Sequence, residues 1–402
     1  MNAPSHVSAR RMIYRIMAST CLLAAGSLGG VAFGASPHSA AMKPSGLLAV
    51  SSPRMIDTTP VTSENTAPRW STSMPPQLVI DRKTPIMLTT ITRQLVLFRY
   101  LQTRWQRTTV MTVPSDQTID GDSIWCGSQR CWIALTTTSP RAPSARLRVL
   151  QSPLSAWHWT TRWSTPVSAS TTGGRLQITR NGSTLWVLST GTPAAGLMPK
   201  QLWSSPNGGA SWSLIATDFG QSTGPLLRLP AGYPTGITAI SSNHLILTLQ
   251  APSTALTAVS YTLHPRAVHV LPFPTPLNVQ WTNALPALVS GSTVTIPIMG
   301  LSHDSKGVLM LATRKFPHSV WMLHSLAALP GGSVTTDSGN VDVLSGTTHL
   351  DVVWPDGHVV QLPELKSFPN PLVTAAMGSH LVVLGKDKSL WVNSHAGWRK
   401  WS

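Results

Sequence analysis

The segment Ser205-Pro206-Asn207-Gly208-Gly209-Ala210-Ser211-Trp212 follows the strand-like residues Lys200-Gln201-Leu202-Trp203. A second segment of the same design, Ser152-Pro153-Leu154-Ser155-Ala156-Trp157-His158-Trp159, follows Leu147-Arg148-Val149-Leu150. Both segments begin with Ser-Pro and end in Trp, and their final tryptophans lie 53 residues apart. Recurrence of one pattern along a chain is the sequence signature of a repeat architecture.

Elsewhere, short runs of β-forming residues alternate with turn residues. Residues 176–179 and 185–188 flank Arg180-Asn181-Gly182-Ser183, which contains Asn-Gly, a strong hairpin signal. Two further pairs of runs, 352–354 with 358–360 and 381–384 with 390–392, also read as hairpins. Because helical periodicity is nearly absent, we expect an all-β protein built from consecutive antiparallel hairpins.

The spacing of the repeat selects one β architecture. Units of about 35–55 residues with about four short strands each are typical of propeller blades, whereas β-helices have shorter repeats and immunoglobulin arrays longer ones. We therefore expect residues 77–402 to form a β-propeller of six or seven four-stranded antiparallel blades.

The first 76 residues have a different composition. Three arginines at positions 10, 11 and 15 precede an uncharged stretch from Ile16 to Ala35, and Ala32-Phe33-Gly34 resembles a cleavage site. This pattern predicts a signal peptide at 1–34, with an uncleaved membrane anchor as the alternative. Residues 35–76 are rich in Pro, Ser and Thr and read as a flexible tether. We expect an extracellular or cell-envelope protein that touches the membrane only through a retained anchor.

The cysteines agree with export. Cys21 lies in the presumed signal and lacks a lipidation context, which leaves Cys126 and Cys131 on either side of a short Gly-Ser turn. Facing positions of such a hairpin are close enough for a disulfide, which forms in oxidising compartments. A two-cysteine metal site would need two further ligands at suitable spacing. We expect the disulfide, no metal and no cofactor.

The charge is strongly positive, with Lys+Arg 30 against Asp+Glu 14 and a formal net charge of +16. The excess arises because acids are scarce, and the bases form no continuous run, so the sequence does not favour nucleic-acid binding. A surface with few carboxylates loses little charge pairing in acid, which fits an acidic habitat.

The motif Ser205-x-Asn207-x-Gly209-x-Ser211-Trp212 resembles the Asp-box, or BNR repeat, of sialidase-like β-propellers, a superfamily that includes photosystem assembly-factor-like propellers. The resemblance implies a hairpin turn between the outer strands of a blade, away from the active face. Gly209 would take a positive φ, the short polar side chains would bond the turn, and Trp212 would pack between sheets. Here Asn207 replaces the usual Asp. The Cys126/Cys131 hairpin also resembles repeats of secreted bacterial propellers.

The sequence has few matches to the residues that sialidase chemistry needs. That chemistry needs three clamping arginines, a Tyr paired with Glu, and an Asp. Phe98-Arg99-Tyr100-Leu101 matches the first clamp segment at two positions, and Glu364 is the sole Glu outside the tether to pair with Tyr100, Tyr233 or Tyr261. A glycoside hydrolase that uses carboxylates at the central channel is the alternative function. The one acidic cluster comprises Asp116, Asp120 and Asp122, and we interpret it as a polar turn and not as a Ca²⁺ site.

We therefore expect an exported, monomeric, non-enzymatic propeller that binds a protein or an envelope glycan in a scaffold or assembly role. No catalytic residue is assigned. Trp157 and Trp163, which flank His158 and Arg162, are candidates to stack on a ligand, whereas Trp159 and Trp212 are expected to pack in the core.

Overall fold

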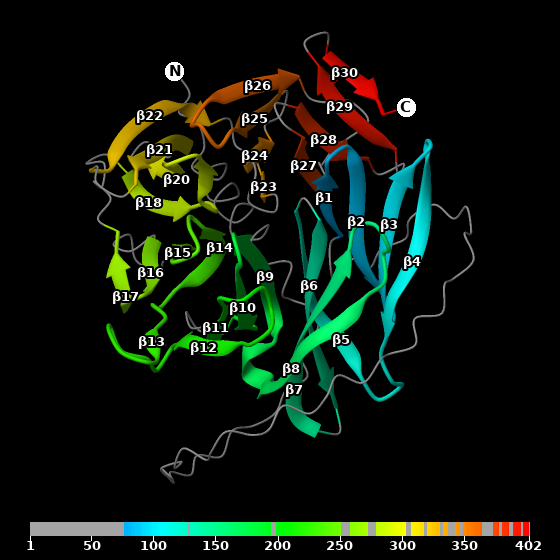
Figure 1. Cartoon of the computed structure of the whole chain (residues 1–402). Helices are drawn as coiled ribbons and strands as arrows, with labels where there is room; N and C mark the ends of the chain where they lie inside the picture. The colour runs from blue at the N-terminus through cyan, green and yellow to red at the C-terminus, as the bar shows by residue number, and fades with distance from the viewer. Residues whose placement is uncertain are drawn as a thin grey trace, which may run out of the picture.

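The computed structural model describes residues 76–402, apart from gaps at 128, 141, 194–197, 251–257, 272–278, 303–306, 317–319, 330–332, 337–341, 346–348, 364–372, 378–379, 386–388, 395–396 and 402. The described strands form seven sheets in a ring, five with four strands and two with five (Figure 1). The predicted all-β propeller is confirmed, and we refer to the sheets as blades 1 to 7 in chain order.

Five blades are meanders of four consecutive strands, whereas blade 3 ends in an additional parallel strand and the first two strands of blade 5 both pair with its third. The first strand of each blade lies nearest the ring axis (Figure 1). Blades 1 to 3 comprise β1 (Gln77–Asp81), β2 (Thr84–Ile91), β3 (Gln94–Leu101), β4 (Arg104–Thr112); β5 (Thr118–Cys126), β6 (Arg130–Ser139), β7 (Ala142–Pro153), β8 (Thr160–Ser168); and β9 (Gly173–Asn181), β10 (Thr184–Gly191), β11 (Lys200–Ser205), β12 (Ser213–Thr217), β13 (Leu227–Arg228). Blades 4 and 5 comprise β14 (Tyr233–Ala239), β15 (His244–Gln250), β16 (Ala258–Leu263), β17 (Arg266–Val270); and β18 (Val279–Ala284), β19 (Leu288–Ser290), β20 (Thr293–Ser302), β21 (Gly307–Lys315), β22 (Met322–Leu329). Blades 6 and 7 comprise β23 (Ser333–Thr336), β24 (Asp342–Ser345), β25 (His349–Val353), β26 (Val359–Pro363); and β27 (Val373–Met377), β28 (His380–Leu384), β29 (Leu390–Ser394), β30 (Gly397–Lys400).

The three hairpins expected from the sequence are present as β9–β10, β25–β26 and β28–β29. In the first, Asn181 pairs with Thr184, so the two loop residues are Gly182 and Ser183. Gly182 has φ 58°, a left-handed conformation that glycine adopts without strain. The register is therefore set by a glycine-containing two-residue turn, as the pattern predicts.

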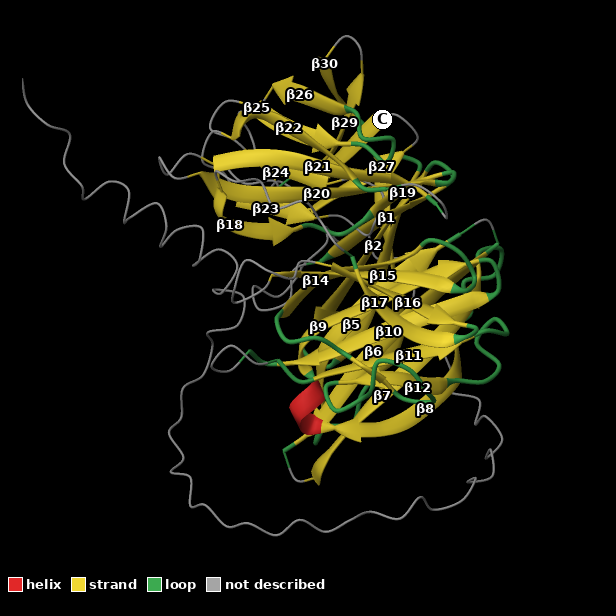
Figure 2. Cartoon of the chain, turned by 90° about the vertical axis from the view of Figure 1, so that its left-hand side faces the viewer, coloured by secondary structure: helices red, strands yellow, loops and turns green. Residues whose placement is uncertain are grey.

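The ring has two unlike faces. The turns between the first and second strands, and between the third and fourth strands, lie on one of them, which we call the hairpin face. Contacts between neighbouring blades place these turns together: Asn181 Nδ2 donates to the carbonyl of Ile240 (3.0 Å). Farther round the ring, Thr295 Oγ1 donates to the carbonyl of Pro355 (3.3 Å). The opposite, loop face carries the connections between blades, including the short helix η1 (Ala169–Thr171), drawn red in Figure 2.

Apolar side chains pack between adjacent blades. One cluster joins blades 1 and 7, and it includes Phe98 and Trp105 from blade 1 with Leu384 and Leu390 from blade 7. Among the described strands, no sheet combines the two ends of the chain, so this packing closes the ring. One hydrogen bond across the same boundary runs from Tyr100 Oη to the carbonyl of Trp401 (3.4 Å).

Replacement of Phe98 tests this closure. Phe98 is 2% exposed, so Phe98→Ala should lower the free energy of unfolding by about 3–5 kcal/mol, as truncation of a buried aromatic usually does. The control is Phe219→Ala, because Phe219 is 95% exposed and should change stability by less than about 0.5 kcal/mol. Urea denaturation measures both, and equal stabilities for the two variants would contradict closure by packing.

Candidate functional site

The disulfide expected from the sequence is present between Cys126 and Cys131, whose Cα atoms lie 4.1 Å apart. The two residues pair directly across β5 and β6. The bond closes the first hairpin of blade 2, and this hairpin lies on the hairpin face. It fixes the positions of Trp125 and Arg130, which sit immediately beside the two cysteines in the sequence.

The turn at 205–212 joins β11 to β12, the third and fourth strands of blade 3, and is tied by side-chain bonds. Ser205 Oγ accepts from the backbone N–H of Gly209 (2.9 Å), and Asn207 Oδ1 accepts from that of Ser211 (2.9 Å). Asn207 Nδ2 also donates to Ser211 Oγ (2.8 Å). Gly209 has φ 86°, and a Cβ there would lie 2.6 Å from the Trp132 ring, so the position requires glycine. The assignment of this turn as an Asp-box stays a prediction.

The aromatic cluster beside this turn involves Trp163. Its ring stacks on Trp212, with ring centroids 5.2 Å apart and planes 22° apart, and it also meets Trp203 at 5.1 Å. The cluster packs against the core between blades 2 and 3. One face of Trp163 is therefore already covered, and only the rest of the ring is left to contact a ligand.

Trp157 lies in the turn between β7 and β8 with φ 49°, an uncommon conformation for a bulky residue. The guanidinium carbon of Arg99, from blade 1, lies 4.7 Å from the centre of its ring. A second pair of the same kind joins the next two blades, because Arg180 of blade 3 lies 5.4 Å over Trp125 of blade 2. Each boundary between blades 1, 2 and 3 thus carries an Arg–Trp pair on the hairpin face. Trp159, by contrast, is 3% exposed and packs in the core between blades 1 and 2.

These arginines belong to a wider basic group that the linear sequence did not reveal. Seven cations lie in the hairpin turns of blades 1 to 3 or within three residues of them: Arg82, Lys83, Arg99, Arg104, Arg130, Arg162 and Arg180. Among the described turns of these blades the accompanying carboxylate is Asp81, whose pKa is raised by burial and lowered in part by Arg82. Burial lowers the pKa of Arg99, and burial followed by the charge of Arg130 lowers that of Arg180. The signal in the sequence was a base in or next to several of the predicted turns.

The acidic cluster does not form one site. Asp122 of β5 points toward blade 1, where its Oδ2 accepts from Thr90 Oγ1 (2.8 Å), and burial raises its pKa to about 6. Asp120 lies at a bulge of the same strand and interacts with the hydroxyls of Thr136 and Thr172 on the side of blade 3. Burial raises its pKa as well. Asp116 lies exposed in the preceding turn.

Among the residues that the structure describes, no group of three His, Cys, Asp or Glu side chains is arranged to hold a metal ion.

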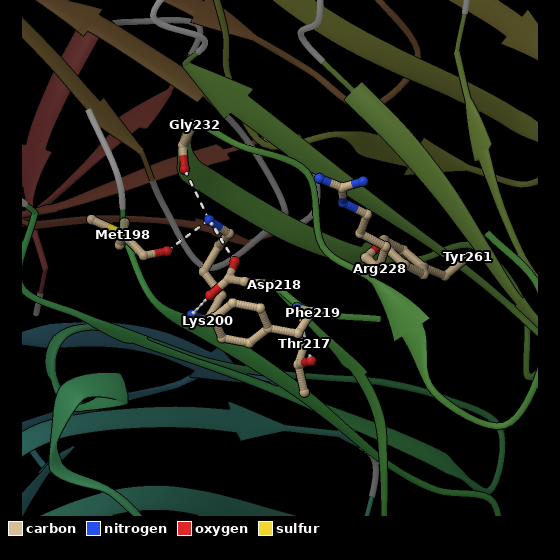
Figure 3. Close-up of polar contacts among 8 residues, drawn as sticks. All are labelled: Met198, Lys200, Thr217, Asp218, Phe219, Arg228, Gly232 and Tyr261. Carbon is tan, nitrogen blue, oxygen red and sulfur yellow. Dashed lines mark hydrogen bonds and ion pairs between the residues drawn. The ribbon is translucent and has the colours of Figure 1, made fainter. Parts of the chain in front are cut away.

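A buried ion pair stabilises the long connection from blade 3 to blade 4 (Figure 3). Lys200 is 2% exposed, its Nζ lies 3.1 Å from Asp218 Oδ1, and it donates to the carbonyls of Met198 (2.7 Å) and Gly232 (3.3 Å). Asp218 Oδ2 accepts in turn from the backbone N–H of Lys200 (2.7 Å). Since all three ammonium protons have an acceptor, the pair acts as a structural clamp.

Several residues and segments singled out in the sequence do not contribute to this site. Tyr261, considered as a nucleophile, is fully buried and donates to the carbonyl of Arg228 (2.9 Å), and burial raises its pKa. Glu364, the signal peptide at 1–34 and nearly all of the tether at 35–76 lie outside the described residues. Within the described part of the chain, no helix is long and apolar enough to cross a membrane.

Comparison with known proteins shows likeness of fold. No protein-family model and no curated protein matches the chain. Among solved structures, the Penicillium chrysogenum α-L-arabinanase bound to arabinobiose is 14% identical, over 70% of this chain and 95% of that one, with a TM-score of 0.40. A Hadza microbial sialidase is 13% identical over 71% of this chain and 64% of that one (TM-score 0.39). The Aleuria aurantia lectin bound to α-methyl-L-fucoside is 12% identical over 81% and 93% (TM-score 0.40). At these identities the likeness concerns the propeller fold alone.

The buried carboxyl of Asp122 predicts a stability that depends on pH. Its pKa is about 6 in the folded chain against 3.8 for the ordinary group, so its stabilising contribution is complete below pH 3.8 and is lost as the pH rises through 6. Relative to Asp122→Asn, the wild-type protein should gain on the order of 2 kcal/mol of unfolding free energy between pH 7 and pH 4. Denaturation at both pH values measures this, and parallel pH profiles for the two proteins would contradict it.

The clamp predicts a second effect. Lys200→Met should lower the free energy of unfolding by about 2–4 kcal/mol, because it leaves Asp218 without its cationic partner and two carbonyls without a donor. Limited proteolysis should then cut first within 218–232. Lys83→Met is the control, since Lys83 is exposed in a turn. A Lys200→Met protein as stable and as resistant as this control would show that the pair contributes nothing.

Proposed function

We propose that this protein is an exported, non-enzymatic β-propeller that binds a glycan of the cell envelope through the hairpin face of blades 1 to 3. The observation that carries the proposal is the pair of Arg–Trp contacts, Arg99 with Trp157 and Arg180 with Trp125, at two successive blade boundaries. Aromatic rings can cover the apolar faces of sugars, while guanidinium groups donate hydrogen bonds to their oxygens.

The rigidity of this face favours binding. Trp157 is held by a bond from its own N–H to the carbonyl of Pro153 (3.0 Å), and the ring packs against the core between blades 1 and 2. Trp125 adjoins the disulfide, and Arg180 Nε donates to the carbonyl of Gly182 (2.7 Å). Side chains that are fixed before binding lose less conformational entropy on contact with a ligand.

Carboxylate-dependent glycoside hydrolysis is a weaker proposal. Both classes of mechanism need two carboxyl groups that flank the same glycosidic bond. Asp120 and Asp122 are the neighbouring carboxylates on an innermost strand, and their contacts direct them to opposite sides of blade 2. The bulge at this point of β5 explains why residues two apart do not share a side.

A capture experiment tests the proposal. Full-length tagged protein should sediment with isolated cell envelopes, and Trp157→Ala should weaken this binding about tenfold or more, as loss of a central aromatic contact does. Trp354→Ala is the matched control, because Trp354 lies partly buried at a hairpin turn of blade 6. Thermal melting should confirm that both variants are folded.

Treatment of the envelopes identifies the ligand class. Periodate, which oxidises sugars, should abolish capture, whereas protease treatment should leave it intact. The reverse result would replace the glycan with a protein partner, and equal binding by the two Trp variants would remove the hairpin face of blades 1 to 3 from the account.

A further inference from the structure

We infer that the hairpin face of blades 1 to 3 binds an acidic polysaccharide, whose carboxylate or sulfate groups are bound by the arginines of that face. The inference rests on the proposed function and adds the charge of the ligand. It concerns a surface distinct from the loop face, where Asp116, Asp120 and Asp218 lie.

The positive charge of this surface is the first observation that favours an acidic ligand. Seven Arg and Lys side chains accompany one carboxylate, Asp81, in the described hairpin turns of blades 1 to 3 or within three residues of them. Like charges gathered on one face repel one another and attract a polyanion, and the attraction acts along the whole face. The pKa of Arg180 is lowered first by burial and then by the charge of Arg130, which agrees with the placement of these two guanidinium groups on one face.

The geometry of the two Arg–Trp pairs is the second observation that favours an acidic ligand. A guanidinium that lies over an indole ring uses its flat face for that contact and keeps its N–H groups at the edge, where they match a carboxylate or sulfate bidentately. Arg99 is half-buried, and its Nε has no hydrogen-bond partner among the described residues. Because Nε is buried, a bound anion would contact the terminal N–H groups of this guanidinium.

The distribution of the cations is the third observation, and it favours a polymer over a small anion. Arg99 stands at the boundary of blades 1 and 2, Arg180 at that of blades 2 and 3, and the exposed Arg130 and Arg162 lie on blade 2 between them. Charges spaced singly over three blades match a polymer with one acidic group per sugar or disaccharide better than a small anion, which would need several donors at one point.

Binding of defined polymers tests the inference. Polygalacturonate should bind full-length protein, fully methyl-esterified pectin should bind much less, and raising the salt from 50 to 500 mM should weaken polygalacturonate binding about tenfold or more. Arg99→Gln and Arg180→Gln should each reduce the affinity about fivefold or more. Arg314→Gln is the matched control, because Arg314 also lies over aromatic rings, Phe316 and Trp321, but on blade 5.

The outcomes separate the two proposals. Equal binding of charged and esterified pectin, insensitive to salt and to both substitutions, would overturn the acidic ligand and leave a neutral glycan standing. Binding of a single-stranded DNA probe in place of polygalacturonate, weakened by Arg99→Gln, would overturn it in favour of nucleic acid. Failure to bind any polymer, together with periodate-resistant capture on envelopes, would overturn the glycan function itself.

Discussion

Closure of the ring by side-chain packing between blades 1 and 7 is the constraint on which the other features depend. Every described blade is built from consecutive strands, so the two ends of the propeller meet without sharing a sheet. Phe98, Trp105 and their partners on blade 7 therefore supply by apolar contact what hydrogen bonds supply within a blade. If this boundary opened, the buried side chains of Phe98 and Trp105 would be exposed to water and blade 1 would be held on one side only, by its packing against blade 2.

A closed ring also explains how a surface arises that the linear chain does not display. Each meander returns to the same face at its first and third turns, so a single base near each turn becomes part of a group when the blades are set side by side. Arg82, Arg130 and Arg180 are about 50 residues apart in sequence yet occupy equivalent hairpins of adjacent blades. Seven of the 30 Lys and Arg residues are thereby gathered on a face where aromatic rings are also present.

Much of the fold could be predicted from local pattern. The Asn-Gly turn and the Cys126/Cys131 spacing depend on residues within one hairpin, and both features are found as expected. The candidate site could not be predicted from local pattern, because Arg99 and Trp157 come from different blades and their contact depends on how the sheets pack. The ion pair of Lys200 with Asp218 likewise depends on tertiary contacts that local pattern does not reveal. The opposite orientation of Asp120 and Asp122 results from a one-residue bulge in β5, which the sequence pattern does not predict. The sequence predicts six or seven blades and does not decide between them, because the repeat pattern weakens after blade 3, whereas the described strands form seven sheets.

The central claim is that the hairpin face of blades 1 to 3 binds a glycan. Hydrogen–deuterium exchange of the protein, with and without envelope glycan, tests it most directly, because it locates the bound surface without substitution of any residue. The account predicts slower exchange in the turns at 81–84, 126–130, 153–160 and 180–183, with little change on the loop face. Protection confined to 113–118, 169–173 and 218–232 would contradict it, since these segments lie on the connections between blades and would place the ligand on the opposite face of the ring.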